Sequence, residues 1–409
     1  MAVISRDPGG FRLVFIQYLT NFWRIVCHRL VFAITYLQSI LRHGSQVSEA
    51  EPQTLLKTIY YADKLGLRFC DRRMTALMND VSASAAATMD FDRAGEKLSS
   101  ARAAIGEVFL GQTQVVDEVM ATLLAGGHGL IVGVPGLGKT LLVETVADVF
   151  GLSTRRVQFT PDLMPADILG SEVLEEVGDG SRAFRFVEGP VFCQLLMTDE
   201  INRASPRTQS ALLQAMQERK VAVGGLNRPL PQPFHVLATQ NPIEQEGAYP
   251  LPEAQLDRFL MEIRIDFPDA ETERAILDKT TGTGLSQAPT AFSDTELMEV
   301  QGLVRAMPIG ETVVDGILRM VRSARPGAVD SPLPVNAVSW GPGPRASQAL
   351  SLAARARALL DGRLAPSTDD VAALAPAILR HRMALTYTAE IEDGLDIDTA
   401  IQKLIGMLG

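Results

Sequence analysis

Cysteine and net positive charge are scarce in this sequence. The three cysteines, Cys27, Cys70 and Cys193, are an odd number without zinc-site spacing, which argues against a disulfide framework and a cysteine-rich metal centre. The formal net charge of −10 argues against a general nucleic-acid binder, because neutralising phosphates requires a basic face. We therefore expect an acidic, soluble protein of a reducing cytoplasm, and we expect no nucleic-acid partner.

Long uncharged apolar runs are also missing. Residues 11–41 are strongly apolar, but three arginines interrupt them, so no uncharged stretch of about 18 residues remains for a spanning helix. Three interpretations of residues 1–73 stay open. They are an upstream extension absent from the working protein, with Met74 or Met78 as alternative starts, a helix lying on a membrane or a partner, and a spanning segment. The expected location is cytoplasmic, with peripheral membrane contact through residues 11–41 as the alternative.

The rest of the chain is patterned as a folded protein. Small and Ala-rich residues at 74–100 indicate a linker or the approach to a helix. From residue 101 helical and strand signals alternate, which predicts an α/β fold with a parallel sheet and crossover helices. The predicted strands are residues 129–134, 155–159, 193–200 and 234–241.

The last third of the chain is helical in pattern. Ala-rich, Leu-rich and Arg-rich segments follow residues 267–277, with proline and glycine breaks at 326–344, and they predict a second, smaller helical domain. Acidic residues after Ser367 and Thr368 predict a helix start there. The resulting division is an extension at 1–73, a linker or helix at 74–100, a core at 101–268 and a helical domain at 269–409.

The segment GVPGLGKT fits the phosphate-loop pattern G-x-x-x-x-G-K-[ST] in full. It follows an apolar strand and precedes a helical pattern, which is the context that the motif requires. Its glycines let backbone N–H groups point at phosphate oxygens beside a helix N-terminus. Lys139 would reach the β and γ phosphates, and the Thr140 hydroxyl would bind Mg²⁺. The predicted nucleotide-binding residues are Gly133, Val134, Pro135, Gly136, Leu137, Gly138, Lys139 and Thr140.

Two carboxylates end an apolar strand about 60 residues later, in LLMTDE. Asp199 is the predicted partner of Mg²⁺. Glu200 is the predicted base that orients or deprotonates the attacking water. A carboxylate that activates water distinguishes a hydrolase from a kinase.

Six segments together resemble the AAA+ ATPases and, within them, the MoxR family. They are GVPGLGKT, QFTPDLMPADILG, FRFVEGPVF, LLMTDEINRASPRTQSALLQAMQE, ATQNPIEQEGAYPLPEAQLDRF and GPGPRAS. The resemblance covers residues 101–409. It implies a core with a parallel five-stranded sheet, a small helical lid, and hydrolysis of ATP with Mg²⁺. It also implies a homo-oligomeric ring of six, a chaperone-like role in maturing a client protein or inserting a metal, and a partner with a von Willebrand factor A domain.

The same resemblance assigns three further site residues. Asn241 matches sensor 1, which helps to hold water near the γ phosphate. Arg258 matches the arginine finger, which is delivered to the ATP of the neighbouring subunit and whose planar guanidinium suits phosphate oxygens. Arg345 matches sensor 2, which reaches from the lid to the nucleotide. Residues 239–259 are accordingly expected to be a loop and a short helix that face the next subunit, and Asn202 and Arg203 are expected at that interface.

Other classes of protein remain open. A self-contained phosphate-loop enzyme such as a small-molecule kinase would need an acceptor site and no arginine from a neighbour. A nucleotide-gated scaffold would bind ATP and hardly hydrolyse it, which Glu200 and Arg258 disfavour. Within the ATPases, a chelatase-type motor subunit and a DNA-remodelling machine are the nearest alternatives. The lack of an evident basic module disfavours the second of these.

Overall fold

The computed structural model describes residues 91–177, 181–243, 248–281 and 288–408. The predictions for residues 1–73, including membrane contact at 11–41, lie outside these ranges. Among the described residues, no helix is long and apolar enough to cross a membrane. Residues 91–108 form a helix whose apolar side is buried, so the last part of the predicted linker or helix at 74–100 is helical.

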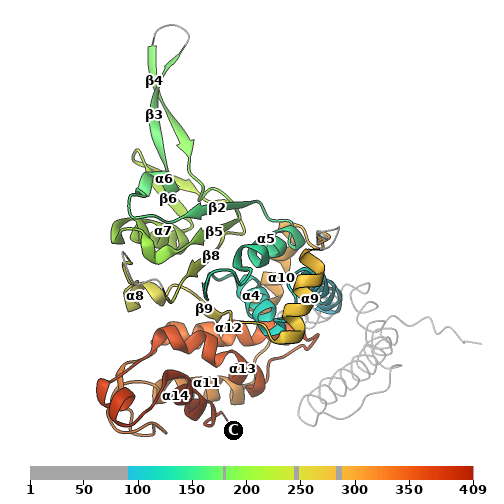
Figure 1. Ribbon diagram of the computed structural model, residues 1–409, viewed down its shortest axis with the longest axis vertical. Coiled ribbons are helices and arrows are strands. Elements are labelled where there is room, and N and C mark those ends of the chain that lie inside the picture. The colour runs from blue at the N-terminus through green and yellow to red at the C-terminus, as the bar shows by residue number, and fades with distance from the viewer. Residues whose placement is uncertain (1–90, 178–180, 244–247, 282–287, 409) are drawn as a thin grey trace, which may run out of the picture. The chain divides into compact units, whose positions relative to one another are not determined.

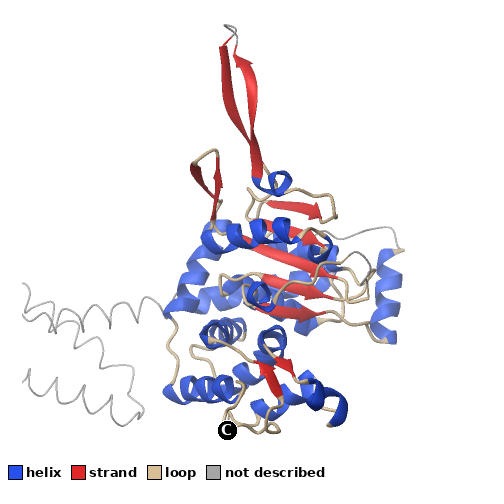
Figure 2. Cartoon of the chain, turned by 90° about the vertical axis from the view of Figure 1, so that its left-hand side faces the viewer, coloured by secondary structure: helices blue, strands red, loops and turns tan. Residues whose placement is uncertain are grey.

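A parallel sheet forms the core, as predicted, and its strands are the red arrows between the helices in Figure 2. The sheet has five strands in the order β2-β5-β8-β1-β9. Its strands are β1 (Gly129–Val132), β2 (Thr154–Gln158), β5 (Leu195–Asp199), β8 (His235–Gln240) and β9 (Met261–Arg264). The four strands expected from the sequence are confirmed, each somewhat shorter than or shifted from its predicted range. The fifth strand, β9, has only four residues with charges at alternate positions, and this pattern is too short to recognise alone.

Helices cover both faces of the sheet and build the lid (Figure 1). The helices of the core are α4 (Thr113–Leu124), α5 (Lys139–Val149), α6 (Pro165–Leu169), η1 (Ile201–Arg203), α7 (Pro206–Glu218) and α8 (Glu253–Leu256). Those that follow are α9 (Ala270–Thr280), α10 (Asp294–Ala306), α11 (Glu311–Ser323), α12 (Pro344–Leu360), α13 (Thr368–Leu379), η2 (Arg380–Arg382), η3 (Thr388–Glu392) and α14 (Ile397–Ile405). The sheet separates two apolar clusters: α4 and α5 lie in the larger one, and α6 and α7 lie in the other.

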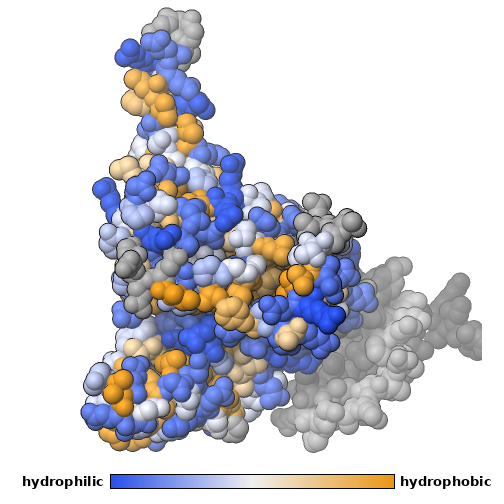
Figure 3. Space-filling model, viewed as in Figure 1, coloured by the Kyte–Doolittle hydropathy of each residue, from blue (hydrophilic) through white to orange (hydrophobic). Residues whose placement is uncertain are grey.

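Three two-stranded antiparallel pairs accompany the main sheet. They are β3 (Gly170–Val177) with β4 (Ser181–Glu188), β6 (Lys220–Val223) with β7 (Leu226–Pro229), and β10 (Val338–Trp340) with β11 (Ala384–Leu385). The β3–β4 hairpin projects beyond the sheet and carries apolar side chains into solvent, among them Leu174 and Phe184 (Figures 1 and 3). None of these pairs was predicted: the strands of the first two mix charged and apolar residues without a clear period, and β10 and β11 have only three and two residues.

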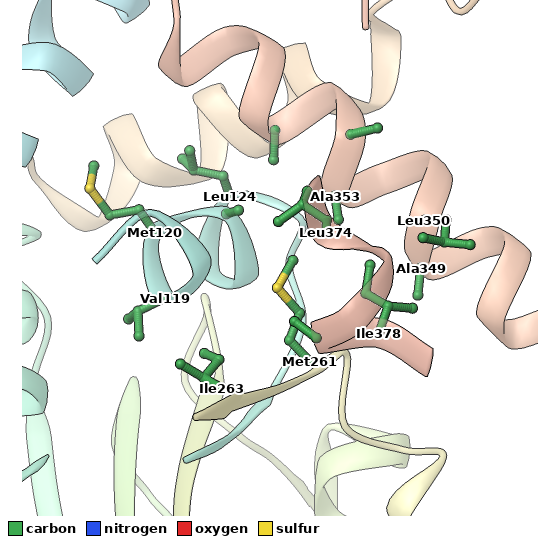
Figure 4. Close-up of a cluster of buried hydrophobic side chains, with 14 of the residues drawn as sticks. Val119, Met120, Leu124, Met261, Ile263, Ala349, Leu350, Ala353, Leu374 and Ile378 are labelled. Carbon is green, nitrogen blue, oxygen red and sulfur yellow. The ribbon is translucent and has the colours of Figure 1, made fainter. Parts of the chain in front are cut away.

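The lid packs on the core through a continuous apolar layer (Figure 4). The layer joins α4 and β9 of the core to α12 and α13 of the lid. Its labelled side chains are Val119, Met120, Leu124, Met261, Ile263, Ala349, Leu350, Ala353, Leu374 and Ile378. The predicted start of α13 is confirmed: Ser367 is its N-cap and Asp370 completes a capping box. The predicted boundary between residues 268 and 269 stays a prediction.

Candidate functional site

The phosphate loop is shaped for close approach of a ligand to its backbone. The Gly133 N–H donates to the Gln240 carbonyl at 3.2 Å, so the loop starts level with the end of β8. Gly136 and Gly138 have φ of +88° and +75°, a left-handed conformation that favours glycine. A Cβ on Gly133 would lie 2.8 Å from the Ile265 carbonyl oxygen, whereas one on Gly136 would meet nothing within 4 Å. The loop therefore packs against the backbone of Ile265 at Gly133 and faces open space at Gly136, which fits a loop that binds phosphate.

The helix α5 begins directly at the end of this loop. Gly138 is its N-cap, so the N–H groups of the first turn have no partners within the helix and can receive an anion. The Lys139 ammonium donates to the carbonyls of Gly133 at 2.6 Å and Val134 at 3.0 Å. Phosphate oxygens would compete with these carbonyls for the ammonium group. The geometry fits the predicted roles of the loop and of Lys139.

The predicted carboxylates meet at the carboxyl ends of β5 and β8. Thr239, which is 2% exposed, donates its hydroxyl to Asp199 Oδ1 at 3.2 Å and accepts the Glu200 N–H at 3.0 Å. Thr239 was not predicted as a site residue, although it lies within the ATQN segment quoted above. It fixes the positions of both acidic residues from the neighbouring strand.

Asp199 has a basic neighbour that the sequence did not indicate. Both Nε and Nη2 of Arg156, on β2, lie 2.6 Å from Asp199 Oδ2, and the carboxylate is almost buried. The oxygens of Asp199 and Thr140 are the hard ligands that Mg²⁺ prefers, and this ion usually binds through one or two protein oxygens together with phosphates. No group of three or more His, Cys, Asp or Glu side chains in the described ranges could hold a metal by itself. The donor set fits Mg²⁺ bound with a nucleotide.

Glu200 is held by two side chains. Its Oε2 accepts hydrogen bonds from Gln158 Nε2 and Arg203 Nη1, each at 2.7 Å. Its backbone has φ of +55°, which is unusual for a residue with a Cβ. Arg203, expected at a subunit interface, thus binds the predicted base within its own chain. Activation of water by Glu200 requires one oxygen of the carboxylate to face the water, either Oε1 or an Oε2 that has exchanged these partners.

Asn241 lies immediately after β8, where sensor 1 was expected. It is 5% exposed, and its Oδ1 accepts the N–H of Ile243 at 3.1 Å, which fixes the side chain over the strand end. Because the ends of β5, β8 and β1 meet at one edge of the sheet, Asn241 shares this edge with Glu200 and the phosphate loop. Sequence reasoning placed these groups together correctly.

The two predicted arginines lie elsewhere, around Asp257. Arg345, the second residue of α12, places Nη1 3.6 Å from Asp257 Oδ2. Arg258 is partly exposed, and within the described ranges its side chain makes no hydrogen bond or ion pair. Residues 239–259 contain a loop and the short helix α8, as expected. That they face another subunit stays a prediction.

A buried arginine beside these residues was not predicted to act there. Arg382, in η2, is 2% exposed and donates to Asp257 Oδ1 at 2.8 Å. No local signal could have found this contact, because the two residues are 125 positions apart.

Two histidines lie at the opposite edge of the sheet, where β1 and β8 begin. His235 Nδ1 lies 2.8 Å from the Gly127 carbonyl oxygen and its Nε2 lies 3.0 Å from Gln301 Nε2, while His128 Nδ1 accepts the Val236 N–H at 3.0 Å. Burial lowers the pKa of His128 to about 3 and that of His235 to about 4. Both imidazoles are therefore neutral structural groups.

Parts of the chain match two protein-family models. Residues 128–261 match the ATPase family associated with various cellular activities (AAA), and residues 335–404 match the AAA lid domain. Chaperone MoxR1 of Mycobacterium tuberculosis is 42% identical over 302 residues, which cover 74% of this chain and 79% of that protein. YeaC of Bacillus subtilis is 37% identical over 302 residues, 74% of this chain and 91% of that protein.

Further similarity extends to another relative and to a solved structure. Protein MoxR of Paracoccus denitrificans is 32% identical over 311 residues, 72% of this chain and 90% of that protein. A crystal structure from Cytophaga hutchinsonii, of a protein whose description proposes an ATPase, has a TM-score of 0.72 and 33% identity. It covers 81% of this chain and 99% of that chain. The similarity therefore spans the core and the lid together.

Proposed function

This chain belongs to the MoxR family of AAA+ ATPases, and from that premise we propose that it is a Mg²⁺-dependent ATPase whose site is shared between neighbouring copies in a ring of six. The observation that carries the proposal is the separation of the site into two parts. The loop and the acidic residues lie at one edge of the sheet, whereas Arg258 lies on a different segment without a side-chain partner in the described ranges. A guanidinium that no described side chain of its own chain binds is suited to delivery to another chain.

Each residue has one task in this mechanism. Lys139 exchanges the carbonyls of its own loop for phosphate oxygens, and Thr140 and Asp199 would hold the metal. Bound Mg²⁺ supplies neutralisation of the charge that develops on the phosphates. Glu200 accepts a proton from water at the carboxylate oxygen that faces it, and Asn241 orients that water. Arg258 of the neighbouring copy donates to phosphate oxygens and stabilises the transition state.

The hydrolysis is proposed to drive chaperone-like remodelling or maturation of a protein client, metal insertion being one form of it. Two facts support this: one relative is named a chaperone, and a lid packed against the core offers an element that can move another chain. A partner with a von Willebrand factor A domain remains part of the proposal.

One observation favours a second candidate, a nucleotide-gated scaffold with little turnover. Arg156 donates a hydrogen bond to Asp199, and Gln158 and Arg203 donate hydrogen bonds to Glu200, so both carboxylates already have partners in the chain. A measured turnover near zero in the presence of saturating ATP and Mg²⁺, with intact binding, would support this candidate.

The test of the shared site is complementation between two inactive variants. Arg258→Ala keeps the phosphate loop and Lys139→Ala keeps the finger, so each is expected to be inactive alone, while their mixture regains Mg²⁺-dependent ATPase activity. Arg274→Ala is the control, because Arg274 is an exposed arginine on α9 and is expected to leave activity unchanged. Full activity of Arg258→Ala alone, measured where sizing finds a monomer, would overturn the shared site.

A further inference from the structure

A buried guanidinium holds the backbone on both sides of Arg258. We call this contact the Arg382 clamp: Arg382 with Asp257, Phe259, Leu260 and Ile378. Its Nε donates to Asp257 Oδ1 at 2.8 Å and its Nη2 to the carbonyls of Phe259 at 2.6 Å and Asp257 at 3.3 Å. Its Nη1 donates to the carbonyls of Leu260 at 3.1 Å and Ile378 at 2.7 Å.

The clamp uses the full hydrogen-bonding capacity of its arginine. A guanidinium has five N–H donors in a rigid plane, and here five acceptors receive them. Burying a charge is costly unless it is paired and fully hydrogen-bonded, so the position of each acceptor is tightly fixed. The neighbouring His381 adds a contact of its Nε2 with the Phe259 carbonyl at 3.1 Å. The backbone that carries Arg258 is thus fixed by the lid.

Asp257 links this clamp to the predicted sensor 2. One oxygen of its carboxylate receives Arg382, and the other lies 3.6 Å from Arg345 Nη1. Both arginines belong to the lid, whereas Asp257 directly precedes Arg258. One carboxylate therefore contacts Arg345 and, through Arg382, holds the segment that carries Arg258.

The packing around the clamp makes this link stiff. β9 starts one residue after the clamped segment, and its Met261 and Ile263 lie in the apolar layer with Leu374 and Ile378 of α13 (Figure 4). Close-packed interiors transmit displacement because they leave no room for independent movement. Arg258 therefore lies next to a closely packed part of the contact between the core and the lid.

We propose that Asp257 is a positioning residue: through Arg382 it sets the place of Arg258, the arginine offered to the neighbouring copy. This proposal rests on the proposed function, because the role of Arg258 does. Without the Asp257 carboxylate, Arg382 loses one of its five acceptors and the segment that carries Arg258 shifts.

The first test uses mixed rings of the full chain. In the mixture of Arg258→Ala and Lys139→Ala chains, turnover arises where the first binds ATP and the second supplies the finger. Asp257→Asn is added to the Lys139→Ala chain in one mixture and to the Arg258→Ala chain in another. We expect kcat to fall roughly ten- to a hundredfold in the first placement only, with KM little changed there, because a misplaced group costs rate.

A merely structural role of Asp257 would act equally in both placements, and that result, or no effect in either, overturns the proposal. Arg382→Lys, which keeps the charge but not the planar donors, is the second variant and is expected to follow the same pattern. Asp398→Asn is the matched control. It breaks another contact between β9 and the lid, that of Asp398 with Arg264 and Arg380, and is expected to leave the mixture unchanged. Absence of turnover in the mixture without Asp257→Asn would overturn the shared site itself.

The second test measures nucleotide affinity and needs no turnover. We expect Asp257→Asn to bind a non-hydrolysable ATP analogue as tightly as the unmodified chain does, because Asp257 acts on the arginine offered to the neighbour. Weaker binding by Asp257→Asn would show that the residue acts on the nucleotide site of its own chain and would overturn the proposal.

Discussion

The phosphate loop and the Arg382 clamp fix charged groups by opposite means. The loop uses eight consecutive residues, positive-φ glycines and backbone N–H groups, and its Lys139 bonds to carbonyls five and six positions away. The clamp uses one buried side chain whose acceptors at 257, 259 and 260 lie more than 120 positions away. The difference teaches that ligand binding can be built locally, whereas communication between domains requires contacts that only the folded chain creates. Substitutions in the two regions should therefore fail in different ways.

The largest effect is expected from Arg382→Ala. Removing this buried guanidinium takes a donor from one oxygen of Asp257 and from four carbonyl groups of the backbone, so the free energy of unfolding should fall by about 3–5 kcal/mol. Chemical denaturation of the nucleotide-free protein would measure it. Lys139→Ala is the contrasting variant, because its hydrogen bonds to the Gly133 and Val134 carbonyls lie within its own loop, and it should change the free energy of unfolding by only about 1 kcal/mol. A similar loss in both variants would contradict the distinction.

Glu200→Gln tests chemistry at the strand end without disturbing binding. Loss of a general base lowers kcat on the order of 10²-fold or more, which corresponds to about 2.7 kcal/mol. ATP binding, measured by calorimetry, should be retained, whereas Lys139→Ala should weaken binding itself. Turnover of Glu200→Gln equal to that of the unmodified chain would remove Glu200 from the mechanism.

Acid should destabilise the folded core through its buried histidines. Burial lowers the pKa of His128 to about 3 and of His235 to about 4, while unfolding returns each to about 6.5. Below pH 6.5 the unfolded chain binds more protons than the folded one, so the free energy of unfolding should fall by roughly 1.4 kcal/mol per pH unit for each histidine. This stabilisation is complete above pH 6.5 and declines as the pH falls toward 4. Denaturation curves between pH 7 and 5 would measure it, and the double variant His128→Asn with His235→Gln should show a shallower dependence.

The smallest effect separates backbone strain from ligand binding. Gly136 and Gly225 both have positive φ and open space where a Cβ would lie. Replacing either by Ala should lower the free energy of unfolding by about 1 kcal/mol, the cost of a left-handed residue with a side chain. Only Gly136→Ala should also weaken nucleotide binding. Equal nucleotide affinity in the two variants would show that the conformation of Gly136 is not used by the ligand.

The local half of this comparison was predictable from the sequence. Four strands, the loop, the acidic strand end and the start of α13 each depend on short patterns of spacing and polarity, and all are confirmed as elements. Their mutual placement followed because parallel strands bring their carboxyl ends to one edge. The family resemblance added the five-strand sheet and the lid.

The long-range half was not predictable. Arg156, Thr239 and Arg382 reach site residues across strands or between the lid and the core, and nothing in their immediate sequence marks them. The hairpin β3–β4 was missed for a related reason. Its apolar residues are exposed, so the burial pattern on which strand prediction depends is absent.

The edge strand β2 links the site to the solubility of the protein. The five-stranded sheet has β2 at one edge and β9 at the other. Four of the five side chains of β2 are exposed, and Val157 is buried. Charged and polar side chains on an open edge keep its unpaired backbone groups from joining the strand of another molecule. Two of these side chains, Arg156 and Gln158, also hold Asp199 and Glu200. Apolar replacements of Arg156 and Gln158 would remove the hydrogen bonds to Asp199 and Glu200, and they would also remove the polar side chains that protect the edge strand. A variant whose turnover rises through these replacements should therefore aggregate more readily than the unmodified chain.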